Sequence, residues 1–405
     1  MQKVLIGLLL FCFAVSTIVV EGARPSILNV VDFGAIGDGQ TNDSMAFLQA
    51  WNALCEATTA PLLRVPAGKT FLLQPVIFSG PCSSSRVRIQ VLGSIVAPRS
   101  RDAWKNGTSE SWLSFSQVLN LTISGTGQID GQGSAWWTHP RSNHLKEMYK
   151  NYNRPTALHF SQCDNLILRG LTHINSPRNH ISINSCIGVI ISHLNIIAPK
   201  ESPNTDGIDI SRSSYVKIRD SNISTGDDCV AVNGNSSYIR IINVVCGPGH
   251  GISVGSLGAK GLTDTVEEVH VRNCTFNRTQ NGVRIKTWQG GQGFARKISF
   301  TQITLIASEN PVIIDQYYCD GEQNCKNGTT AVAVSNVIYS DIKGTSAQKE
   351  AIRLDCSEIG CTNIVMNRIY IAPSAPLVHQ TEAYCQNVRG TSNNVTPNVN
   401  CLSGS

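Results

Sequence analysis

A recurring apolar triplet constrains the fold of this chain more than any other feature. From about residue 160, triplets with apolar residues at the first and third positions repeat at intervals of roughly 22 to 40 residues. One series is Leu166–Leu168, Val189–Ile191, Val216–Ile218, Ile239–Ile241, Val269–Val271, Ile298–Phe300, Val337–Tyr339 and Ile364–Met366. A second series lies between its members: Ile181–Ile183, Ile208–Ile210, Val230–Val232, Ile252–Val254, Val283–Ile285, Val312–Ile314 and Ile352–Leu354. Such a period is typical of repeat architectures.

Each triplet has the pattern of a short strand. The apolar positions are rich in Ile and Val, they alternate with other residues, and Gly, Asn and Ser separate one triplet from the next, which is the signature of strands joined by turns. We therefore expect an all-β solenoid with two or three strands in each turn. Stacking each strand on its counterpart in the next coil gives a parallel β-helix with continuous apolar ladders in its core.

A barrel of alternating strands and helices is the rival architecture. The segments between triplets are mostly too short for helices of about ten residues, the length that separates helices from strands. Charged residues make up only 15% of the chain and glycines number 34, which also favours strands and turns. We expect a single catalytic domain over residues 23–405.

One segment has a helical pattern, from Asp43 to about Glu56. Its residues Phe47, Leu48, Trp51, Leu54 and Cys55 fall on one face at helical spacing. Thr41 and Asn42 precede the segment as candidate N-caps. Because the terminal coil of a solenoid needs a cover, we expect this helix to cap the N-terminal end.

The first 22 residues resemble a secretory signal peptide. Lys3 precedes an apolar stretch from Val4 to Val20, and the small residues Gly22 and Ala23 follow it. A membrane anchor is the alternative, but the apolar stretch is short for a spanning helix. We expect a secreted protein of the extracellular space or cell wall, without a membrane association after cleavage.

Cysteine content agrees with an oxidising compartment. The sequence has 14 cysteines, and loss of Cys12 with the signal peptide leaves an odd number, so at least one thiol stays unpaired within the chain. Closeness in sequence favours the pairs Cys55–Cys82, Cys229–Cys246, Cys319–Cys325, Cys356–Cys361 and Cys385–Cys401. Zinc is the other common reason for clustered cysteines, but two cysteines separated by two residues do not occur here.

Glycosylation and charge point to the same environment. Acceptor sequences of the form Asn-X-Ser/Thr begin at Asn42, Asn106, Asn120, Asn222, Asn235, Asn273, Asn277, Asn327 and Asn394. The formal net charge is +5, and a mildly basic surface suits a polyanionic partner. Because no run of Lys or Arg is present, we do not expect nucleic acid to be that partner.

Ionisable residues gather in one column of the repeat. The residue two positions before each strand of the second series is Asn179, Asp206, Asp228, His250, Asn281, Asn310 or Glu350. Asp206 and Asp228 are 22 residues apart, as are Asp228 and His250, so one coil separates each pair. Asp227 lies next to Asp228. The sequence therefore predicts three carboxylates and an imidazole on neighbouring rungs.

Neighbouring carboxylates are suited to acid–base chemistry. Like charges at close range raise the pKa of one member, which then holds a proton that its neighbour lacks. On the coil after His250, Arg284 and Lys286 leave the same face of a strand. These cations either neutralise the carboxylates or bind an anionic substrate, for which Arg is well suited. A single Asp in such a column would more often form turn hydrogen bonds, but a structural role does not explain six charged residues on four consecutive coils.

The residues of this cluster resemble the four signature motifs of the polygalacturonases, glycoside hydrolase family 28. The motifs are Asn204-Thr205-Asp206-Gly207, Gly226-Asp227-Asp228-Cys229, Gly249-His250-Gly251 and Arg284-Ile285-Lys286. They occur in the family's order and spacing, and the resemblance covers roughly residues 27–386. The chain also resembles the plant-type members of the family. It implies a right-handed, pectin-lyase-like parallel β-helix and a pectinase without cofactor or metal.

The resemblance also implies a role for each matching residue. Asp227 would be the general acid, Asp206 and Asp228 would activate water, and His250 would set the protonation of the acid. Arg284 and Lys286 would bind galacturonate carboxylates, Asn204 would shape the cleft, and Tyr318 rather than Tyr317 would contact substrate. We expect a monomer that hydrolyses the α-1,4 bonds of homogalacturonan with inversion, in cell wall remodelling.

Other functions stay open at this point. A pectate lyase on the same fold would need carboxylates that bind Ca²⁺, whereas the vicinal Asp pair and the imidazole suit hydrolysis better. A non-catalytic pectin-binding protein would have no need for intact motifs. The sequence does not separate endo from exo action, and it leaves rhamnogalacturonan and xylogalacturonan as alternative substrates.

Overall fold

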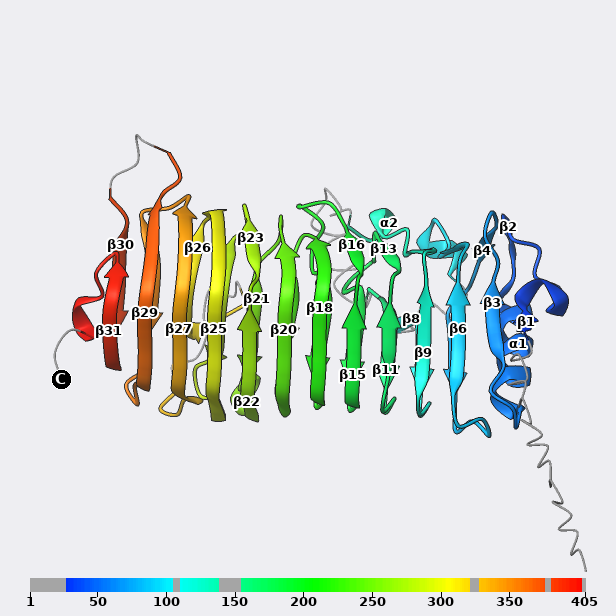
Figure 1. The fold of residues 1–405 in the computed structure, drawn as a ribbon, viewed down its shortest axis with the longest axis horizontal. Coiled ribbons are helices and arrows are strands. Elements are labelled where there is room, and N and C mark those ends of the chain that lie inside the picture. Colours follow the sequence, from blue (N-terminus) through cyan, green and yellow to red (C-terminus); the bar gives the residue numbers. More distant parts are fainter. Residues whose placement is uncertain (1–26, 105–109, 138–153, 321–327, 376–379, 403–405) are drawn as a thin grey trace, which may run out of the picture.

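The repeating triplets form the coils of a parallel β-helix. The computed structural model describes residues 27–104, 110–137, 154–320, 328–375 and 380–402. Figure 1 shows the coils side by side in one row, from the N-terminal end to the C-terminal end. All strand pairs between coils are parallel in the described residues, as in β17 (Ile208–Ser211) with β19 (Val230–Val232). The prediction of an all-β solenoid is confirmed.

Within the described residues the strands belong to two sheets, of 20 and 11 strands. The larger, sheet A, contains β1 (Ile27–Asn29), β2 (Asp38–Asn42), β3 (Leu62–Val65), β4 (Thr70–Leu72), β6 (Val87–Val91), β7 (Ser94–Val96), β9 (Leu121–Gly125), β10 (Gln128–Asp130), β12 (Ile167–Arg169), β13 (Thr172–Ile174), β15 (Ile187–Ser192), β16 (Asn195–Ile197), β18 (Ser214–Ser224), β20 (Ser236–Cys246), β22 (Thr263–Arg272), β23 (Thr275–Asn277), β25 (Gln292–Ser308), β27 (Ala333–Ser346), β29 (Cys361–Pro373) and β31 (Val388–Thr396). The smaller, sheet B, contains β5 (Val76–Ser79), β8 (Ser111–Ser116), β11 (Thr156–Ser161), β14 (Ile181–Asn184), β17, β19, β21 (Ile252–Leu257), β24 (Asn281–Trp288), β26 (Asn310–Tyr318), β28 (Glu350–Asp355) and β30 (Glu382–Gln386).

Each predicted series corresponds to one sheet. The first series of triplets lies in sheet A and the second in sheet B. The stack also extends further toward the N-terminus than the triplets predicted, because β1 already pairs with β3. Helix α1 interrupts these first coils between β2 and β3, so their repeat is harder to recognise in the sequence.

A bend in sheet A gives each coil three sides. In β18, Asp220 has a φ of 51°. Its left-handed backbone conformation turns the chain between the two straight halves of the strand. The first half pairs with β15 and the second with β16. Asp220, Asn243 and Asn273 occupy the bend on successive coils and are linked by amide hydrogen bonds of 2.8 to 2.9 Å. A ladder of hydrogen-bonded polar side chains therefore lies at this bend.

Inward-facing residues of the two sheets form one continuous core. Along β18, Val216 and Ile218 are buried whereas Lys217 between them is exposed. In β17, Ile208 and Ile210 are buried in the same way. Since alternate residues of a strand point to opposite faces, the outward face of sheet B and the outward face of sheet A lie on opposite sides of this core.

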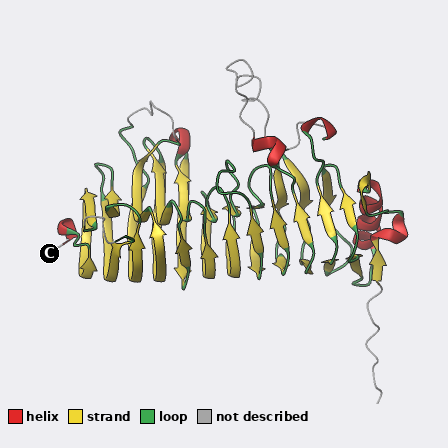
Figure 2. Ribbon diagram, turned by 90° about the horizontal axis from the view of Figure 1, so that it is seen from above, coloured by secondary structure: helices red, strands yellow, loops and turns green. Residues whose placement is uncertain are grey.

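The predicted capping helix is present as α1 (Ser44–Glu56). Phe47, Trp51 and Leu54 are buried against the first coils, and Figure 2 shows the helix at the N-terminal end of the stack. Thr41 and Asn42 were expected to cap it, but the N-cap residue is Asp43. The Asp43 carboxylate instead accepts hydrogen bonds from the amides of the preceding turn, which leaves Asn42 to accept the amide of Ser44.

The other helices in the described residues are single short turns, which are too short to show a helical pattern of apolar residues. They are α2 (Ser134–Trp137) and the 3-10 turns η1 (Val30–Phe33), η2 (Arg101–Ala103), η3 (Ala259–Gly261) and η4 (Asn400–Leu402). None of the helices in the described part of the chain is long and apolar enough to cross a membrane. The predicted signal peptide, residues 1–22, lies outside the described residues.

Four of the five predicted disulfides are present. They join Cys55 to Cys82, Cys229 to Cys246, Cys356 to Cys361 and Cys385 to Cys401. Cys325, the expected partner of Cys319, lies outside the described residues. Cys163, Cys186 and Cys274 are buried free thiols, in line with the odd number of cysteines.

The core prediction can be tested by shortening one ladder residue. We expect Ile218→Ala to lower the free energy of unfolding by about 2–5 kcal/mol, because it removes three buried carbons and leaves a cavity. Ile187→Ala, at a position of the neighbouring strand that is 53% exposed, should change it by less than about 0.5 kcal/mol. Urea denaturation followed by circular dichroism measures both, and equal losses would contradict the inward register of β18.

Candidate active site

The in-register stacking of sheet B brings the predicted site residues together. Ile208 pairs with Val230, and Val230 pairs with Ile252. The residues two positions earlier, Asp206, Asp228 and His250, therefore follow the same register on three consecutive coils. On the next coil, Arg284 and Lys286 leave the outward face of β24.

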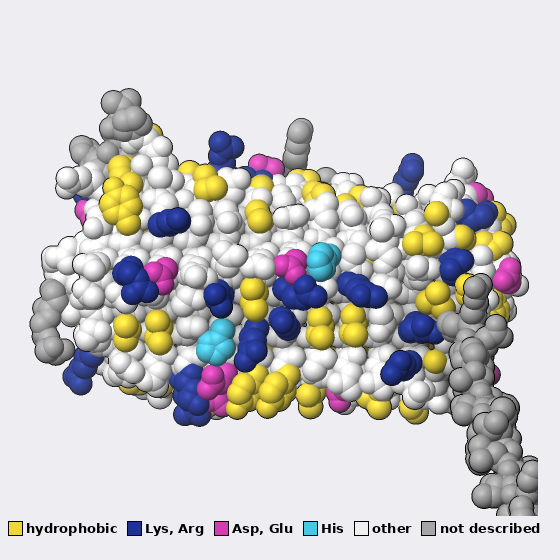
Figure 3. Space-filling view, in the orientation of Figure 1, with side chains coloured by type: hydrophobic (Ala, Val, Ile, Leu, Met, Phe, Trp, Pro, Cys, Tyr) yellow, Lys and Arg dark blue, Asp and Glu magenta, His cyan; other side chains and the backbone are white. Residues whose placement is uncertain are grey.

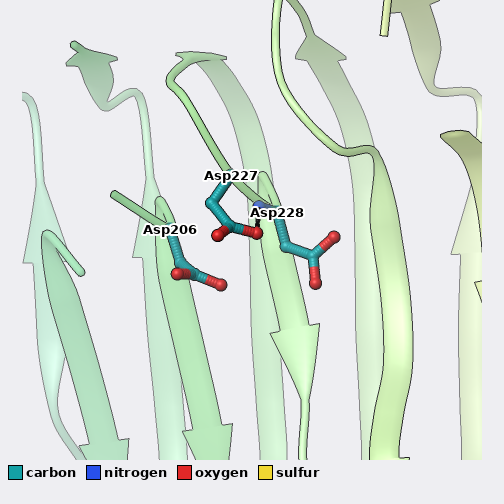
Figure 4. A group of neighbouring side chains, drawn as sticks. All are labelled: Asp206, Asp227 and Asp228. Carbon is teal, nitrogen blue, oxygen red and sulfur yellow. Dashed lines mark hydrogen bonds between the residues drawn. The ribbon is translucent and has the colours of Figure 1, made fainter. Parts of the chain in front are cut away.

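The three aspartates form a compact cluster. Figure 4 shows Asp206 on the chain leading into one coil and Asp227 with Asp228 on the chain leading into the next. One carboxylate oxygen from each residue lies within 4.8 Å of those of the other two. The backbone amide of Asp228 donates a 2.8 Å hydrogen bond to Oδ1 of Asp227, which keeps the two vicinal carboxylates pointing in different directions.

Asp228 is fully buried between two cations. Its Oδ1 accepts from Arg284 Nη2 at 2.8 Å and its Oδ2 accepts from Lys286 Nζ at 2.9 Å. Ser253 Oγ donates to Oδ1 at 2.9 Å and itself accepts from Arg284 Nε. Burial alone would raise the pKa of Asp228, but the charges of Arg284 and Lys286 outweigh it and hold that pKa below its ordinary value. Asp228 is therefore ionised.

Asp206 has the opposite electrostatic environment. Burial raises its pKa well above the ordinary value, and the nearby carboxylates of Asp209, Asp227 and Asp228 raise it further. The cluster therefore keeps one proton at a pH where isolated aspartates have lost theirs. A protonated carboxyl beside an ionised one is the arrangement that paired acid–base catalysis requires.

The carboxylate of Asp227 contacts the imidazole of His250 and the neutral amide of Asn204. Its Oδ1 lies 2.9 Å from Nδ1 of His250, and its Oδ2 accepts a 3.3 Å hydrogen bond from Asn204 Nδ2. The Asp227 side chain is 17% exposed, whereas Asp228 has no exposed surface. Asp227 can therefore meet a molecule in the cleft directly.

Tight backbone packing fixes the loop that carries the aspartate pair. A Cβ at Gly226 would lie 1.9 Å from the carbonyl oxygen of Ser202, so only glycine fits there. The Gly226 amide donates to Thr205 Oγ1 at 3.0 Å, which joins this loop to the one that precedes Asp206. Cys229, directly after the pair, is held by its disulfide to Cys246.

Tyr318 completes the basic side of the site. The Lys286 ammonium lies 5.1 Å from the centre of the Tyr318 ring, within the range of a cation–π interaction. The ring also packs edge-on against Trp288 at 5.6 Å. Its hydroxyl donates a 2.7 Å hydrogen bond to Asp320. The eight predicted site residues thus form one connected cluster, with Asp206 joined through the other carboxylates.

Several neighbouring polar residues were not predicted from the sequence. Asp209 lies on the outward face of β17, where Asn179 donates to its Oδ2 at 2.7 Å, and burial raises its pKa to about 7. Arg154 donates to the side chain of Asn204 and to the carbonyl of Pro203. The spacing of Asp209, three residues after Asp206, could have marked it, but no sequence pattern marks Arg154.

A pocket adjoins the cluster at His250. It has a volume of about 120 Å³ and is lined by Lys200, Gly249, His250, Gln280 and Glu309. The pocket has a polar lining and is large enough for part of a sugar ring. Since His250 contacts Asp227, a ligand in this pocket would extend directly to the acid–base cluster.

The chemistry of the donors disfavours a metal at the aspartates. Three carboxylates within 4.8 Å could hold a cation. However, both oxygens of Asp228 already accept from Arg284 and Lys286, and a divalent ion would have to lie beside these two positive charges. The described residues therefore balance the charge of the cluster with cations of their own.

Comparisons with known proteins show what this chain is similar to. The model of the family "Glycosyl hydrolases family 28" matches residues 55–397. A probable polygalacturonase of Arabidopsis thaliana is 49% identical over 379 residues, which is 93% of this chain and 80% of the relative. Polygalacturonase-2 of Solanum lycopersicum is 41% identical over 378 residues, or 93% and 81% of the two chains. The crystal structure of an endo-xylogalacturonan hydrolase from Aspergillus tubingensis superposes with a TM-score of 0.76 at 26% identity, covering 90% of this chain and 96% of that one.

The raised pKa of Asp209 predicts how stability depends on pH. Because this carboxyl binds its proton more tightly in the folded than in the unfolded chain, stability should fall as the pH rises from about 4 to about 7. One such group contributes a slope of up to about 1.4 kcal/mol per pH unit. We expect Asp209→Asn to flatten this slope, measured as melting temperature against pH, whereas Asp102→Asn at an exposed position should leave it unchanged. An unaltered slope in Asp209→Asn would contradict the assignment.

Proposed function

The chain belongs to glycosyl hydrolases family 28 and is a polygalacturonase that hydrolyses pectin, and we propose that the cluster of Asp206, Asp227 and Asp228 is its catalytic centre. The single observation that carries the assignment is the divided environment of the three carboxylates. Two cations lower the pKa of Asp228, while burial and the neighbouring carboxylates raise the pKa of Asp206. Hydrolysis of a glycosidic bond needs one carboxyl group in each state.

We assign the general acid to Asp227. It is the vicinal aspartate with exposed surface, and within the described residues no Lys or Arg lies in hydrogen-bond contact with it. His250 Nδ1 contacts the same oxygen that accepts the Asp228 amide. The imidazole would orient Asp227 and exchange a proton with it between turnovers, so that the acid can protonate the leaving glycosidic oxygen again.

We assign the activation of the attacking water to Asp206 and Asp228. Asp206 is only partly buried, so it can contact a water molecule, whereas Asp228 is enclosed by Ser253, Arg284 and Lys286. We propose that Asp206 first passes its proton to Asp227 within the carboxylate cluster, that the ionised Asp206 then accepts the proton of the attacking water, and that the fixed charge of Asp228 favours this transfer. Because both oxygens of Asp228 are engaged by cations, it is a poor nucleophile, which supports attack by water in a single displacement.

Arg284 and Lys286 would bind the uronate groups of the substrate. Their side chains keep 11% and 10% of their surface exposed. An ammonium has three donors and a guanidinium has five, and Asp228 and Ser253 use only some of them. The remaining donors would bind an anionic sugar with little loss of conformational entropy, because both side chains are already ordered. Tyr318, above the Lys286 ammonium, would pack against the same sugar.

Further features of the protein follow as proposals from the sequence. We propose that residues 1–22 direct secretion, that residues 23–405 are one catalytic domain, and that a monomer acts in the cell wall. The disulfides in the described residues suit an oxidising compartment. We propose homogalacturonan as the substrate, because two adjacent cations match a polymer in which neighbouring sugars both carry carboxylates.

Removal of the proposed acid tests the mechanism. We expect Asp227→Asn to lower kcat on polygalacturonate by about a thousandfold, because general acid catalysis contributes roughly 10²–10⁴. Release of reducing ends measures this change. The control is Asp220→Asn, an aspartate at the bend of sheet A, which should retain full turnover and a normal melting temperature. Normal turnover by folded Asp227→Asn protein would remove Asp227 from the acid role.

The stereochemistry of the product is a separate test. Single displacement predicts that the first product from the α-linked polymer is the β-anomer, visible by proton NMR before mutarotation. The aspartate oxygens approach within 4.8 Å, closer than the carboxyl separation of about 6.5–9.5 Å usual in inverting enzymes, so this measurement is informative. An α-anomer as first product would indicate a covalent intermediate. Unsaturated products that absorb in the ultraviolet and vanish with a chelator would indicate a lyase instead.

A further inference from the structure

The outward face of sheet A carries a row of cations remote from the candidate active site. Lys217 and Arg240 occupy the same position of β18 and β20, and Arg169, Arg219 and Arg272 occupy the next outward position of β12, β18 and β22. We call these five residues the basic strip. Figure 3 shows dark-blue side chains gathered in the middle of this face, with few magenta ones among them.

The stacking of the coils gives the basic strip a regular spacing. Lys217 and Arg240 are partners on adjacent coils, which are about 4.8 Å apart. Arg169, Arg219 and Arg272 recur on every second coil, with Ser192 and Ile242 between them. The positive charges therefore form a row along the axis of the solenoid.

Most of these charges have no acidic partner. In the described residues Arg219 forms an ion pair with Asp220, but no ion pair within 4.0 Å involves Arg169, Lys217, Arg240 or Arg272. Like charges on directly paired strand positions destabilise a sheet, and Lys217 with Arg240 is such a pair. On the next coils of the same sheet, by contrast, Glu267 pairs with Arg296 and Glu268 with Lys297. A merely solvated face would interleave the two signs as those coils do.

An exposed aromatic stack borders the basic strip. Tyr215 and Tyr238 lie two residues before Lys217 and Arg240, respectively, on the same strands. Their rings stack with centres 4.7 Å apart, and the two residues are 59% and 46% exposed. Exposed aromatic surface next to unpaired cations is more typical of a binding surface than of a solvated face.

The basic strip cannot be part of the catalytic cleft. Lys217 points away from the core on the side opposite to Ile218, and the catalytic cluster lies on the outward side of sheet B, across that core. In Figure 1 the labelled strands of sheet B lie behind those of sheet A. A ligand on the basic strip and a substrate in the cleft would therefore be bound on opposite faces at the same time.

We propose that the basic strip is a second, non-catalytic binding surface for a polyuronate chain. A de-esterified uronate polymer carries one carboxylate on every sugar, so a row of cations along the solenoid can contact several of them at once. Such binding would hold the enzyme on its polymer while the opposite face cuts another chain. The identity of the ligand rests on the proposed function, whereas the existence of an anion-binding row does not.

The test is the double variant Lys217→Thr with Arg240→Thr. Threonine suits an exposed strand position, so the fold should be kept. Both proteins carry Asp227→Asn so that the polymer is not cut, and trigalacturonate is added to occupy the cleft. Retention on immobilised polygalacturonate is then measured against salt concentration. We expect the variant to bind about fivefold more weakly, because exposed ionic contacts each contribute a modest factor and are screened by salt.

A charge-matched control comes from the C-terminal coils. Lys343→Thr with Arg389→Thr removes two exposed cations from β27 and β31 of the same sheet, and it should leave retention unchanged. Equal losses in the two double variants would show an effect of net charge alone and overturn the proposal. Unchanged retention of Lys217→Thr with Arg240→Thr on polygalacturonate would also overturn the proposal. The same holds if this variant loses retention only on fully methyl-esterified pectin or on single-stranded DNA.

Turnover separates this proposal from the catalytic one. With Asp227 restored, the Lys217→Thr and Arg240→Thr variant should hydrolyse trigalacturonate at the rate of the unaltered chain, but it should degrade dilute long polymer about fivefold more slowly. Absence of hydrolysis by the unaltered chain would refute the proposed function and leave the retention result standing. An equal loss on trimer and polymer would show that the substitutions act on the cleft and would overturn the second surface.

Discussion

The buried carboxylate of Asp228 between Arg284 and Lys286 is the interaction on which the candidate site depends. It joins two coils that are 56 residues apart in sequence, and it concentrates positive charge where an anionic substrate would bind. An unpaired charge at this depth would be strongly destabilising, so each of the three residues requires the others. The same pairing lowers the pKa of Asp228, and the charge of Asp228 adds to the burial that raises the pKa of Asp206.

Most of the fold could be predicted from the sequence because one physical rule repeats. Inward residues must be apolar at every coil, so Ile208, Val230 and Ile252 recur at the spacing of the coil and predict their own register. The first coils were missed because helix α1 interrupts their repeat. The N-cap of that helix was misplaced by one residue because the Asp43 carboxylate accepts from the amides of Ile36 and Gly37 instead of capping the helix. Hydrogen bonds to a distant turn have no signature in local sequence.

The position of the site could be predicted from the sequence, but the hydrogen bonds and ion pairs between its side chains could not. Counting coils places Asp206, Asp228 and His250 on neighbouring rungs, and the structure has them there. Counting does not show that His250 contacts Asp227 rather than Asp228, or that both cations choose Asp228. Those choices depend on side-chain rotamers and on burial. Arg154 comes from a different coil, and nothing in its local sequence indicates that it reaches Asn204.

Helix α1 has a consequence beyond the stability of the first coil. A parallel β-helix ends in strands whose amide and carbonyl groups lack a neighbour, and such an edge is a template for another chain. By lying across the first coils, with Phe47 and Trp51 buried beneath it, the helix denies that template to a second molecule. Without such a cover, a solenoid whose core pattern could continue indefinitely would offer this end for growth into fibres.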